Sequence, residues 1–288
     1  MGTLVAIQGI EKKFDHAQLL LKEGHLVTIL RDMQRVLIAY SGGTDSAYLA
    51  WAAKKALGDN AIAITADSPS IPDSHKRDAV DFAIAHGILH EMIPTSEFEN
   101  PAYVANNPDR CFHCKDELFR VMDNIATDRG FDHIVYGVNV DDLGDYRPGQ
   151  SAAKIHQVKS PLVDAGLTKA EIRELSKLAQ LETWDRPAAA WLSSRIPYGT
   201  EVTPERIKVV EQGEEAIKAL GFRQFRVRYH GNLVRIEIDP SELEKALNLR
   251  CAAELTSIFK SLGFHYVTLD LEGYRQGSLN AVLSDTNQ

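Results

Sequence analysis

The sequence has few cysteines, no long apolar run and no excess of positive charge. Three cysteines among 288 residues cannot form a disulfide framework, and the pair Cys111-x-x-Cys114 suggests metal, redox or sulfur chemistry in a reducing compartment. No apolar stretch approaches the ~18 residues of a membrane span, and Met1–Phe14 lacks the apolar core of a signal peptide. The net charge of −8 argues against a general binder of nucleic acid or anionic membranes. We therefore expect a cytoplasmic protein that binds neither.

The sequence does have the composition of an ordinary globular protein. It is 44% hydrophobic and 25% charged, and its length suggests one larger and one smaller domain, which we place at residues 1–200 and 201–288. In the first, strand-like and helix-like segments alternate, which predicts an α/β fold with a doubly wound parallel sheet. The strands are expected at Val36–Tyr40, Ala61–Ala66, Leu89–Ile93 and His133–Tyr136, and the helices at Ser46–Leu57, Ser74–His86 and Lys115–Arg129.

The character of the sequence changes near Thr200. Thr203 and Pro204 begin a predicted helix that runs to about Leu220. Two alternating segments around Gly231-Asn232 predict a β-hairpin. A helix from Ser241 to about Leu262 and a strand at Tyr266–Leu271 complete a small α+β unit.

The most informative motif is Ser41-Gly42-Gly43-Thr44-Asp45-Ser46, between a predicted buried strand and a predicted helix. Glycines at such a turn let backbone N–H groups approach an anion, and the helix N-terminus attracts the same anion. No lysine follows the glycines, so this is not the P-loop of kinases and GTPases. We interpret it as a pyrophosphate-binding loop for ATP, with Asp45 as a ligand of Mg²⁺. The alternative is an ordinary turn capped by Asp45 or Ser46.

Polar segments also follow two other predicted strands. In a doubly wound sheet the ligand crevice lies beyond the carboxyl ends of the strands, so we add Ala66, Ser68 and Gly137 to the candidate nucleotide-binding residues. The pair Asp141-Asp142 could hold a metal ion or a ribose hydroxyl, or it could be two solvated turn carboxylates.

The loop resembles that of the N-type ATP pyrophosphatases, and further segments give a more specific resemblance to the LarE family of ATP-dependent sacrificial sulfur transferases. These segments are Thr65–Ser70, Arg110–Lys115, Asp141–Gly149, Ser193–Thr200 and Arg226–Arg228. The resemblance covers about residues 15 to 280. It implies that the protein adenylates a carboxylate of a pyridinium mononucleotide with release of pyrophosphate, then replaces the activated oxygen with sulfur and releases AMP. The family's product matures into the nickel-pincer cofactor of lactate racemase. The family also suggests a homo-oligomer.

The resemblance also assigns the binding site for the substrate phosphate. Ser194, Arg226 and Arg228 match the family's residues, and Arg195 and Arg147 are further candidates for anion binding. Arg226 and Arg228 are two apart in a predicted strand, so both side chains leave one face, which suits a phosphate or carboxylate. Taken alone, that face could simply be solvated. We expect Glu214, Glu215 and Glu237 to be surface charges and Cys251 to be a buried structural residue.

The cysteines depart from both arrangements known in the family. One branch combines a C-x-x-C pair with a third cysteine, as a [4Fe-4S] site, where this chain has Trp191. The other has a sacrificial cysteine where this chain has Ala190. Cys111 or Cys114 could donate or relay sulfur, or a cluster could form with an unconventional ligand. Alternatively the protein is a synthetase with a nitrogen nucleophile, or a non-catalytic protein that binds nucleotide and zinc.

Overall fold

The computed structural model describes residues 14–143, 148–187 and 191–275. Arg147 and Ala190, both singled out from the sequence, lie outside these ranges. The strands are β1 (Val36–Ala39), β2 (Ala61–Asp67), β3 (Leu89–Pro94), β4 (His133–Tyr136), β5 (Phe225–His230), β6 (Leu233–Ile238) and β7 (Tyr266–Leu269). The α-helices are α1 (His16–Met33), α2 (Thr44–Leu57), α3 (Asp73–Ala85), α4 (Pro101–Val104), α5 (Arg110–Arg129), α6 (Pro148–Ile155), α7 (Pro161–Asp164), α8 (Lys169–Leu178), α9 (Pro204–Ala219), α10 (Leu243–Leu247) and α11 (Leu249–Ser261).

The first sheet is parallel, with strand order β3-β2-β1-β4. Because β2 and β4 flank β1 on opposite sides, the strand order reverses between β1 and β4. In open α/β sheets ligands bind at the carboxyl ends of the strands at this reversal. The loop after β1, at Ser41–Ser46, and the loop after β4, at Gly137–Asp142, both begin there. The predicted α/β fold with a doubly wound sheet is therefore confirmed.

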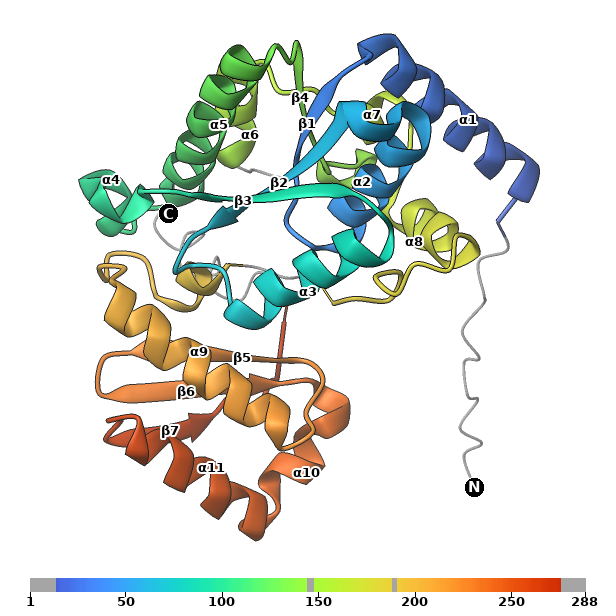
Figure 1. The fold of residues 1–288 in the computed structure, drawn as a ribbon. Helices are drawn as coiled ribbons and strands as arrows, with labels where there is room; N and C mark the ends of the chain where they lie inside the picture. The colour runs from blue at the N-terminus through green and yellow to red at the C-terminus, as the bar shows by residue number, and fades with distance from the viewer. Residues whose placement is uncertain (1–13, 144–147, 188–190, 276–288) are drawn as a thin grey trace, which may run out of the picture.

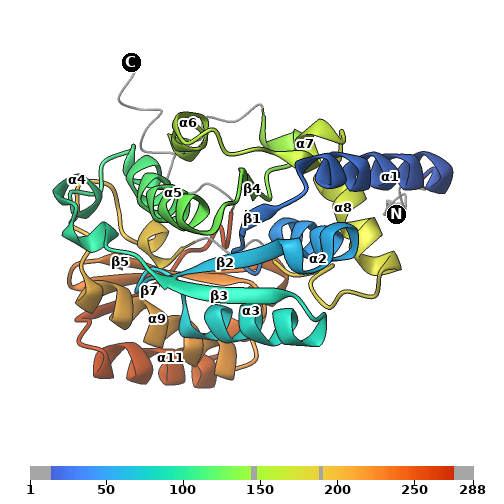
Figure 2. The same ribbon diagram turned by 45° about the horizontal axis from the view of Figure 1, so that its top comes forward.

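Helices cover both faces of this sheet (Figures 1 and 2). The side chains of β1 alternate, so Val36 and Ile38 pack toward α1, α2, α3, α7 and α8. Leu37 and Ala39 instead face the core formed with α5 and α6. Burial on both faces explains why β1 is apolar throughout rather than alternating. None of the described helices is long and apolar enough to cross a membrane.

The second sheet has the order β5-β6-β7 and lies with α9, α10 and α11 below the first sheet in Figure 1. The predicted hairpin is confirmed, because β5 and β6 pair antiparallel with His230 opposite Leu233. Its core continues into the first unit, since Tyr103 of α4 and Cys114 of α5 belong to the same buried cluster as Val227. The predicted helix 241–262 is wrong as one helix. Asn248 is extended, and its side chain accepts from Arg250 N to cap α11.

The start of α5 also differs from the prediction. The helix begins at Arg110 rather than Lys115, so Cys111 and Cys114 lie in its first turns instead of in a preceding loop. The segment Arg110-Cys-Phe-His-Cys has weak helix propensity, but Arg110 is buried and donates to the carbonyl of Ser193 at 2.9 Å. Tertiary contact therefore extends the helix N-terminally by about a turn.

Candidate functional site

The loop after β1 is shaped by its own serines and by a glycine at positive φ. Ser46 Oγ lies 3.0 Å from Ser41 Oγ and donates to the Gly43 carbonyl at 3.1 Å. Gly42 has a φ of +72°, and a Cβ added there would lie 3.3 Å from the Cβ of Ala79 in α3. The loop leads directly into α2, whose first amides have no partner within the helix. This arrangement suits a phosphate group.

Gly137 packs against the same turn from the end of β4. A Cβ added to Gly137 would come within 2.7 Å of Ser46 N and 2.8 Å of Ser46 Cα. Only glycine allows this approach of two backbone segments. The structure thus brings Gly137 and the loop Ser41–Ser46 together where the strand order reverses.

Asp45 lies in this loop, in the first turn of α2. One of its carboxylate oxygens accepts a hydrogen bond and the other does not. Its Oδ2 accepts a hydrogen bond of 2.7 Å from Lys169 Nζ. Its Oδ1 is buried and makes no hydrogen bond of normal geometry with a described residue. Burial raises the pKa of Asp45, against the opposing effects of Lys169 and of the Asn139 side chain, which lies close enough to lower that pKa. A buried carboxylate oxygen that makes no such bond, beside a helix N-terminus that suits phosphate, fits a Mg²⁺ ion shared with ATP.

Lys169 is a site residue that the sequence reasoning missed. It is the first residue of α8, and its N–H donates to Asp141 Oδ2 at 2.8 Å. Thr168 and Glu171 form a capping box around it, a pattern that predicts a helix start but no contact with Asp45. Asp142 in turn accepts from Asn139 N at 3.1 Å. Both acidic residues of the Asp141-Asp142 pair thus hold the local backbone.

At the end of β2 the candidate residues Ala66 and Ser68 are buried. The Ser68 hydroxyl donates to Glu97 Oε1 and accepts from Ser70 N at 2.9 Å. This side chain faces the interior, whereas Asp67 beside it is exposed and pairs with Lys76. Nucleotide contacts by Ala66 and Ser68 stay a prediction.

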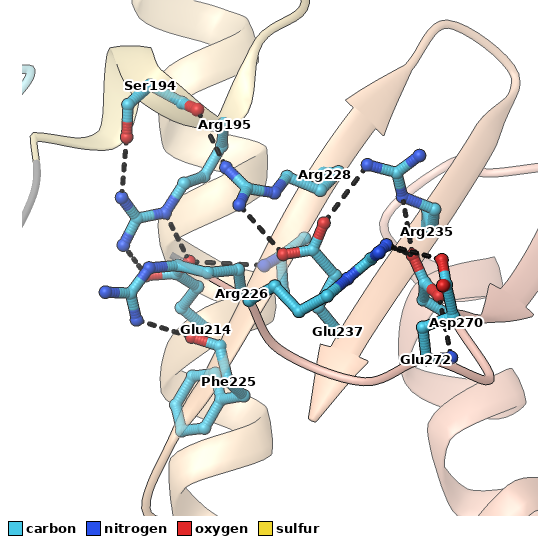
Figure 3. Close-up of polar contacts among 12 residues, drawn as sticks. Ser194, Arg195, Glu214, Phe225, Arg226, Arg228, Arg235, Glu237, Asp270 and Glu272 are labelled. Atoms are coloured by element: carbon cyan, nitrogen blue, oxygen red, sulfur yellow. Dashed lines mark hydrogen bonds and ion pairs between the residues drawn. The ribbon is translucent and has the colours of Figure 1, made fainter. Parts of the chain in front are cut away.

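The four residues expected to bind the substrate phosphate do lie together (Figure 3). The Ser194 carbonyl accepts from Arg228 Nη1 at 2.9 Å, and the Ser194 hydroxyl accepts from Arg195 Nη1 at 2.8 Å. Arg226 donates to the carbonyl of Phe225 at 2.6 Å. Arg228 is 5% exposed, so the alternative of a solvated strand face is wrong for it.

Two carboxylates hold these arginines, and the expectation that both are surface charges is wrong. Glu214 accepts from Arg195 Nε at 2.7 Å and from Arg195 Nη2 at 3.1 Å. Burial alone would raise the pKa of Glu214, but Arg195 outweighs it and holds that pKa below its usual range. Glu237 is 0% exposed and accepts from Arg228 at 2.8 Å and Arg235 at 3.1 Å. Of the three predicted surface charges only Glu215 is exposed.

Several arginines lie together around these two carboxylates in the described part of the chain. Arg195, Arg226, Arg228 and Arg235 surround Glu214 and Glu237, with Asp270 pairing to Arg235 from the far side. Burial lowers the pKa of Arg226, as does the neighbouring charge of Arg195. Arg195 and Arg228 are buried, and Arg226 and Arg235 are half-buried. Neighbouring guanidinium groups that repel one another are stabilised by a bound anion, and their fork geometry suits phosphate.

The phosphate loop and the arginines are connected through α3. The carbonyl of His75 lies against Gly42, at 3.7 Å from a Cβ placed there. His75 and Glu214 also line one cavity of about 60 Å³, and Arg195 lies within electrostatic reach of the imidazole. Burial lowers the pKa of His75. His75 therefore links Gly42 of the loop to Glu214 beside the arginines.

The three cysteines are free and differ in exposure. Cys111 is exposed, Cys114 is buried, and Cys251 is half-buried rather than buried as expected. Trp191 packs between the cores of both units. Within the described ranges, no three cysteine, histidine or acidic side chains are grouped so that they could hold a metal ion. Cys111 and Cys114 alone do not fit an iron–sulfur cluster or a structural zinc ion, which need three or four ligands.

Comparison with known proteins places the chain among full-length relatives. It is 35% identical over 272 residues to the pyridinium-3,5-bisthiocarboxylic acid mononucleotide synthase of Lactiplantibacillus plantarum, covering 93% of this chain and 97% of that protein. It is 46% identical over 253 residues to an uncharacterized protein of Synechocystis sp., covering 88% and 94%. An uncharacterized protein of Methanocaldococcus jannaschii is 29% identical over 242 residues, covering 84% and 91%. No protein-family model matches the chain.

Proposed function

Because the chain belongs to the LarE family, together with the synthase of Lactiplantibacillus plantarum, we propose that it activates a carboxylate of a pyridinium mononucleotide with ATP and transfers sulfur to it. The reaction releases pyrophosphate and AMP, and its product is a thiocarboxylate precursor of a nickel-pincer cofactor. The observation that carries the proposal is the pairing of a phosphate-binding loop with a separate cluster of arginines. Such a pairing serves one nucleotide that is cleaved and one phosphate-bearing substrate.

The loop supports the first half of this reaction. Amides at the start of α2 and the close packing of Gly137 on Ser46 define a cradle for phosphate oxygens. Asp45 would hold a Mg²⁺ ion, which when bound would neutralise charge on the departing pyrophosphate. Lys169, 2.7 Å from Asp45 Oδ2, holds the carboxylate in place and adds a positive charge beside the same phosphates. We propose cleavage of ATP between its α- and β-phosphates.

The arginine cluster supports the binding of the acyl substrate. Arg226 and Arg228 leave β5 on one face, and the carbonyl and hydroxyl of Ser194 orient Arg228 and Arg195. Held in this way, the guanidinium groups lose little entropy when they bind a phosphate. Anchoring the substrate phosphate here fixes the carboxylate relative to the ATP α-phosphate, which is the geometry adenylation needs.

We propose that the Cys111–Cys114 pair delivers the sulfur to the activated carboxylate. Trp191 occupies the position of the third cluster ligand of one family branch, and the pair has no third ligand among the residues described. No step of the reaction is therefore assigned to an iron–sulfur cluster or a zinc ion.

A product analysis tests the proposal. Purified protein, ATP and Mg²⁺ are incubated with nicotinic acid mononucleotide and related pyridinium carboxylates, with sulfide or ammonia as alternative nucleophiles. We expect AMP and pyrophosphate, not ADP, and a mass gain that identifies sulfur in the product. Asp45→Asn should lower turnover by about a hundredfold or more, and Asp59→Asn, an exposed change just beyond the end of α2, should not. Formation of an amide would instead favour a synthetase with a nitrogen nucleophile, and intact ATP would overturn the proposal.

A further inference from the structure

Cys111 and Cys114 are placed for chemistry with each other. They lie three apart at the start of α5, and residues three apart on a helix share a face with Cβ atoms about 5–6 Å apart. That spacing needs only small adjustment for a disulfide. Their environments differ, because Cys111 is exposed and Cys114 is 8% exposed. An accessible thiol followed by a buried one is the usual division between an attacking and a resolving cysteine.

A buried carboxylate, that of Glu97, lies near Cys114, the resolving cysteine. Glu97 is 2% exposed, and its Oε2 has no hydrogen-bond partner in the part of the chain that the structure describes. The 3-10 helix Glu97–Glu99 packs against α5. Ser96 fixes it there by donating to Glu117 Oε1 from its N–H at 3.2 Å and its hydroxyl at 3.0 Å. Since Glu117 follows Cys114 by three residues on the same helix face, Glu97 is held beside Cys114.

The surroundings of Cys114 keep its proton in place. Burial raises the pKa of Cys114 well above its usual value, and Glu97 and Cys111 raise it further. Arg110 and Lys115 on α5 oppose this shift, and Tyr103 of α4 is the other titratable group nearby. A thiol in this setting reacts only when a neighbouring base takes its proton. The unpartnered Glu97 Oε2 is the base that the structure provides.

We propose that Cys111 and Cys114 form a dithiol couple, in which Cys111 presents sulfur, Cys114 closes a disulfide with it, and Glu97 accepts the proton of Cys114. The couple takes sulfur from a persulfide donor. The Cys111 thiolate attacks the outer sulfur of that donor and forms a Cys111 persulfide. The rest of the donor leaves as a thiolate. This assignment deepens the proposed function, on which its acyl-transfer step rests.

The remaining steps balance in atoms and electrons. The terminal sulfur of the Cys111 persulfide displaces AMP from the acyl adenylate and forms an acyl disulfide. Cys114 then transfers its proton to Glu97 and attacks Cys111 Sγ, so that the thiocarboxylate leaves and a Cys111–Cys114 disulfide remains. The two cysteine thiols supply the two electrons that reduce the transferred sulfur. A dithiol reductant then restores both thiols.

The pair also lies on the correct side of the fold. Because α5 comes after β3 in a parallel sheet, it starts at the carboxyl edge, where the loop Ser41–Ser46 also lies. The first residue of α5, Arg110, donates to the Ser193 carbonyl, next to the Ser194 that orients the arginines. Leu192 N in turn donates to the carbonyl of Ser70 at 2.7 Å, after β2. The cysteines therefore adjoin both proposed binding regions.

Redox titration of the whole protein tests the couple without ATP or substrate. The protein is equilibrated in dithiothreitol buffers of graded potential, trapped with a maleimide and weighed intact. On oxidation, wild type and the control Cys251→Ser should form one disulfide and therefore take up two fewer maleimides after denaturation, from three to one in wild type and from two to none in Cys251→Ser, whereas Cys111→Ser and Cys114→Ser should not form it. Uptake of three maleimides by wild type at every potential would overturn the proposal. Failure of adenylation with a working couple would contradict only the proposed function.

The role of Glu97 is tested by the rate of closure. Dithiobis(nitrobenzoate) should form a mixed disulfide with Cys111, and attack by Cys114 then releases a second thionitrobenzoate. Glu97→Gln keeps a group that accepts from Ser68 and should slow this second release by about a hundredfold, whereas the exposed Glu99→Gln should not. If Glu97→Gln does not fold, Glu97→Asp and Glu97→Ala are compared, and the variant that keeps a carboxylate should close the disulfide faster. An unchanged rate in Glu97→Gln, or equal rates in Glu97→Asp and Glu97→Ala, would overturn the role.

Discussion

Lys169 donates a hydrogen bond of 2.7 Å to Asp45 Oδ2, while Oδ1 of the same carboxylate is buried and makes no hydrogen bond of normal geometry with a described residue. The two residues are 124 positions apart and come from the first turns of α2 and α8. Their contact draws the segments after β1 and β4 into one site. The unengaged oxygen is the feature that most directly suggests a metal ion.

Asp45→Asn should therefore separate metal-dependent nucleotide binding from folding. The amide can still contact Lys169 less strongly but offers no anionic oxygen to Mg²⁺, so ATP cleavage should fall by about a hundredfold or more. Isothermal titration should show wild-type protein binding ATP more tightly with Mg²⁺ than with EDTA, a difference that the variant loses. Equal Mg²⁺ dependence in both proteins would contradict this role. Asp59→Asn serves as the control.

Gly137→Ala should disrupt the phosphate site through backbone geometry alone. The new methyl group would lie 2.7 Å from Ser46 N, so β4 and α2 must move apart. We expect a loss of about 1–3 kcal/mol in the free energy of unfolding and weaker ATP binding. Gly24→Ala is the matched control, because no atom lies within 4 Å of its added Cβ and alanine favours a helix. Chemical denaturation measures the free energy of unfolding of both variants. Equal losses in the two would contradict the close approach of Gly137 to Ser46.

Glu237→Gln should impair the arginine site. Glu237 is fully buried between Arg228 and Arg235, so neutralising it removes the carboxylate that pairs with the buried Arg228, whereas Arg235 keeps its contact with Asp270. The expected cost is about 3 kcal/mol of stability. In the folded fraction KM for the phosphate-bearing substrate should rise more than kcat falls, since Arg228 loses its orientation. Glu215→Gln on the exposed face of α9 should change neither constant, and an unchanged KM in Glu237→Gln would contradict the assignment.

His156 should make stability depend on pH. Its Nδ1 lies 2.5 Å from Asp123 and its Nε2 3.0 Å from Asp116. Burial alone would lower the pKa of His156, but these hydrogen bonds outweigh it and raise that pKa above 6.5. Because the pKa of His156 is higher in the folded than in the unfolded protein, its charged form stabilises the fold fully at any pH below the unfolded-state pKa. This stabilisation is lost as the pH rises through the folded-state pKa.

Denaturation of wild type and His156→Asn between pH 5.5 and 9 measures this effect, in a range chosen to span about 1 unit below and 2 above the ordinary histidine pKa. The stability difference should be about 1–2 kcal/mol at the acidic end and shrink toward the alkaline end. A difference that grows with pH would show that the sign is wrong. His133→Asn, at the half-buried first position of β4, is measured alongside as the control substitution.

Local patterns predicted much of this molecule, and contacts distant in sequence explain what they missed. The period of two in β5 places Arg226 and Arg228 on one face, and the glycine-rich loop follows β1 as expected. Nothing local to Glu214 or Glu237 indicates that arginines cover their carboxylates, so the sequence predicts both at the surface. Glu214 meets Arg195 across 19 residues, and only the strand register puts Glu237 beside Arg228.

Contacts that are distant in sequence also explain why local patterns do not predict the roles of Lys169 and Glu97. Lys169 carries only a helix-start pattern, and Glu97 sits in a short acidic segment that is typical of a surface turn. Their contacts with Asp45 and Ser68 depend on how the strand ends assemble. The break at Asn248 had a local signal, because asparagine favours an N-cap, but the helical pattern on both sides outweighs a single polar residue.

Mass spectrometry of the product formed before sulfur is supplied tests the central claim most directly. The double variant Cys111→Ser/Cys114→Ser, which lacks both thiols of the pair, is incubated with ATP, Mg²⁺ and a pyridinium carboxylate mononucleotide. If the loop and the arginine cluster serve adenylation, the adenylated mononucleotide and one equivalent of pyrophosphate should accumulate, and Arg228→Ala should reduce both. ATP left intact, or ADP and phosphate in place of AMP and pyrophosphate, would contradict the account.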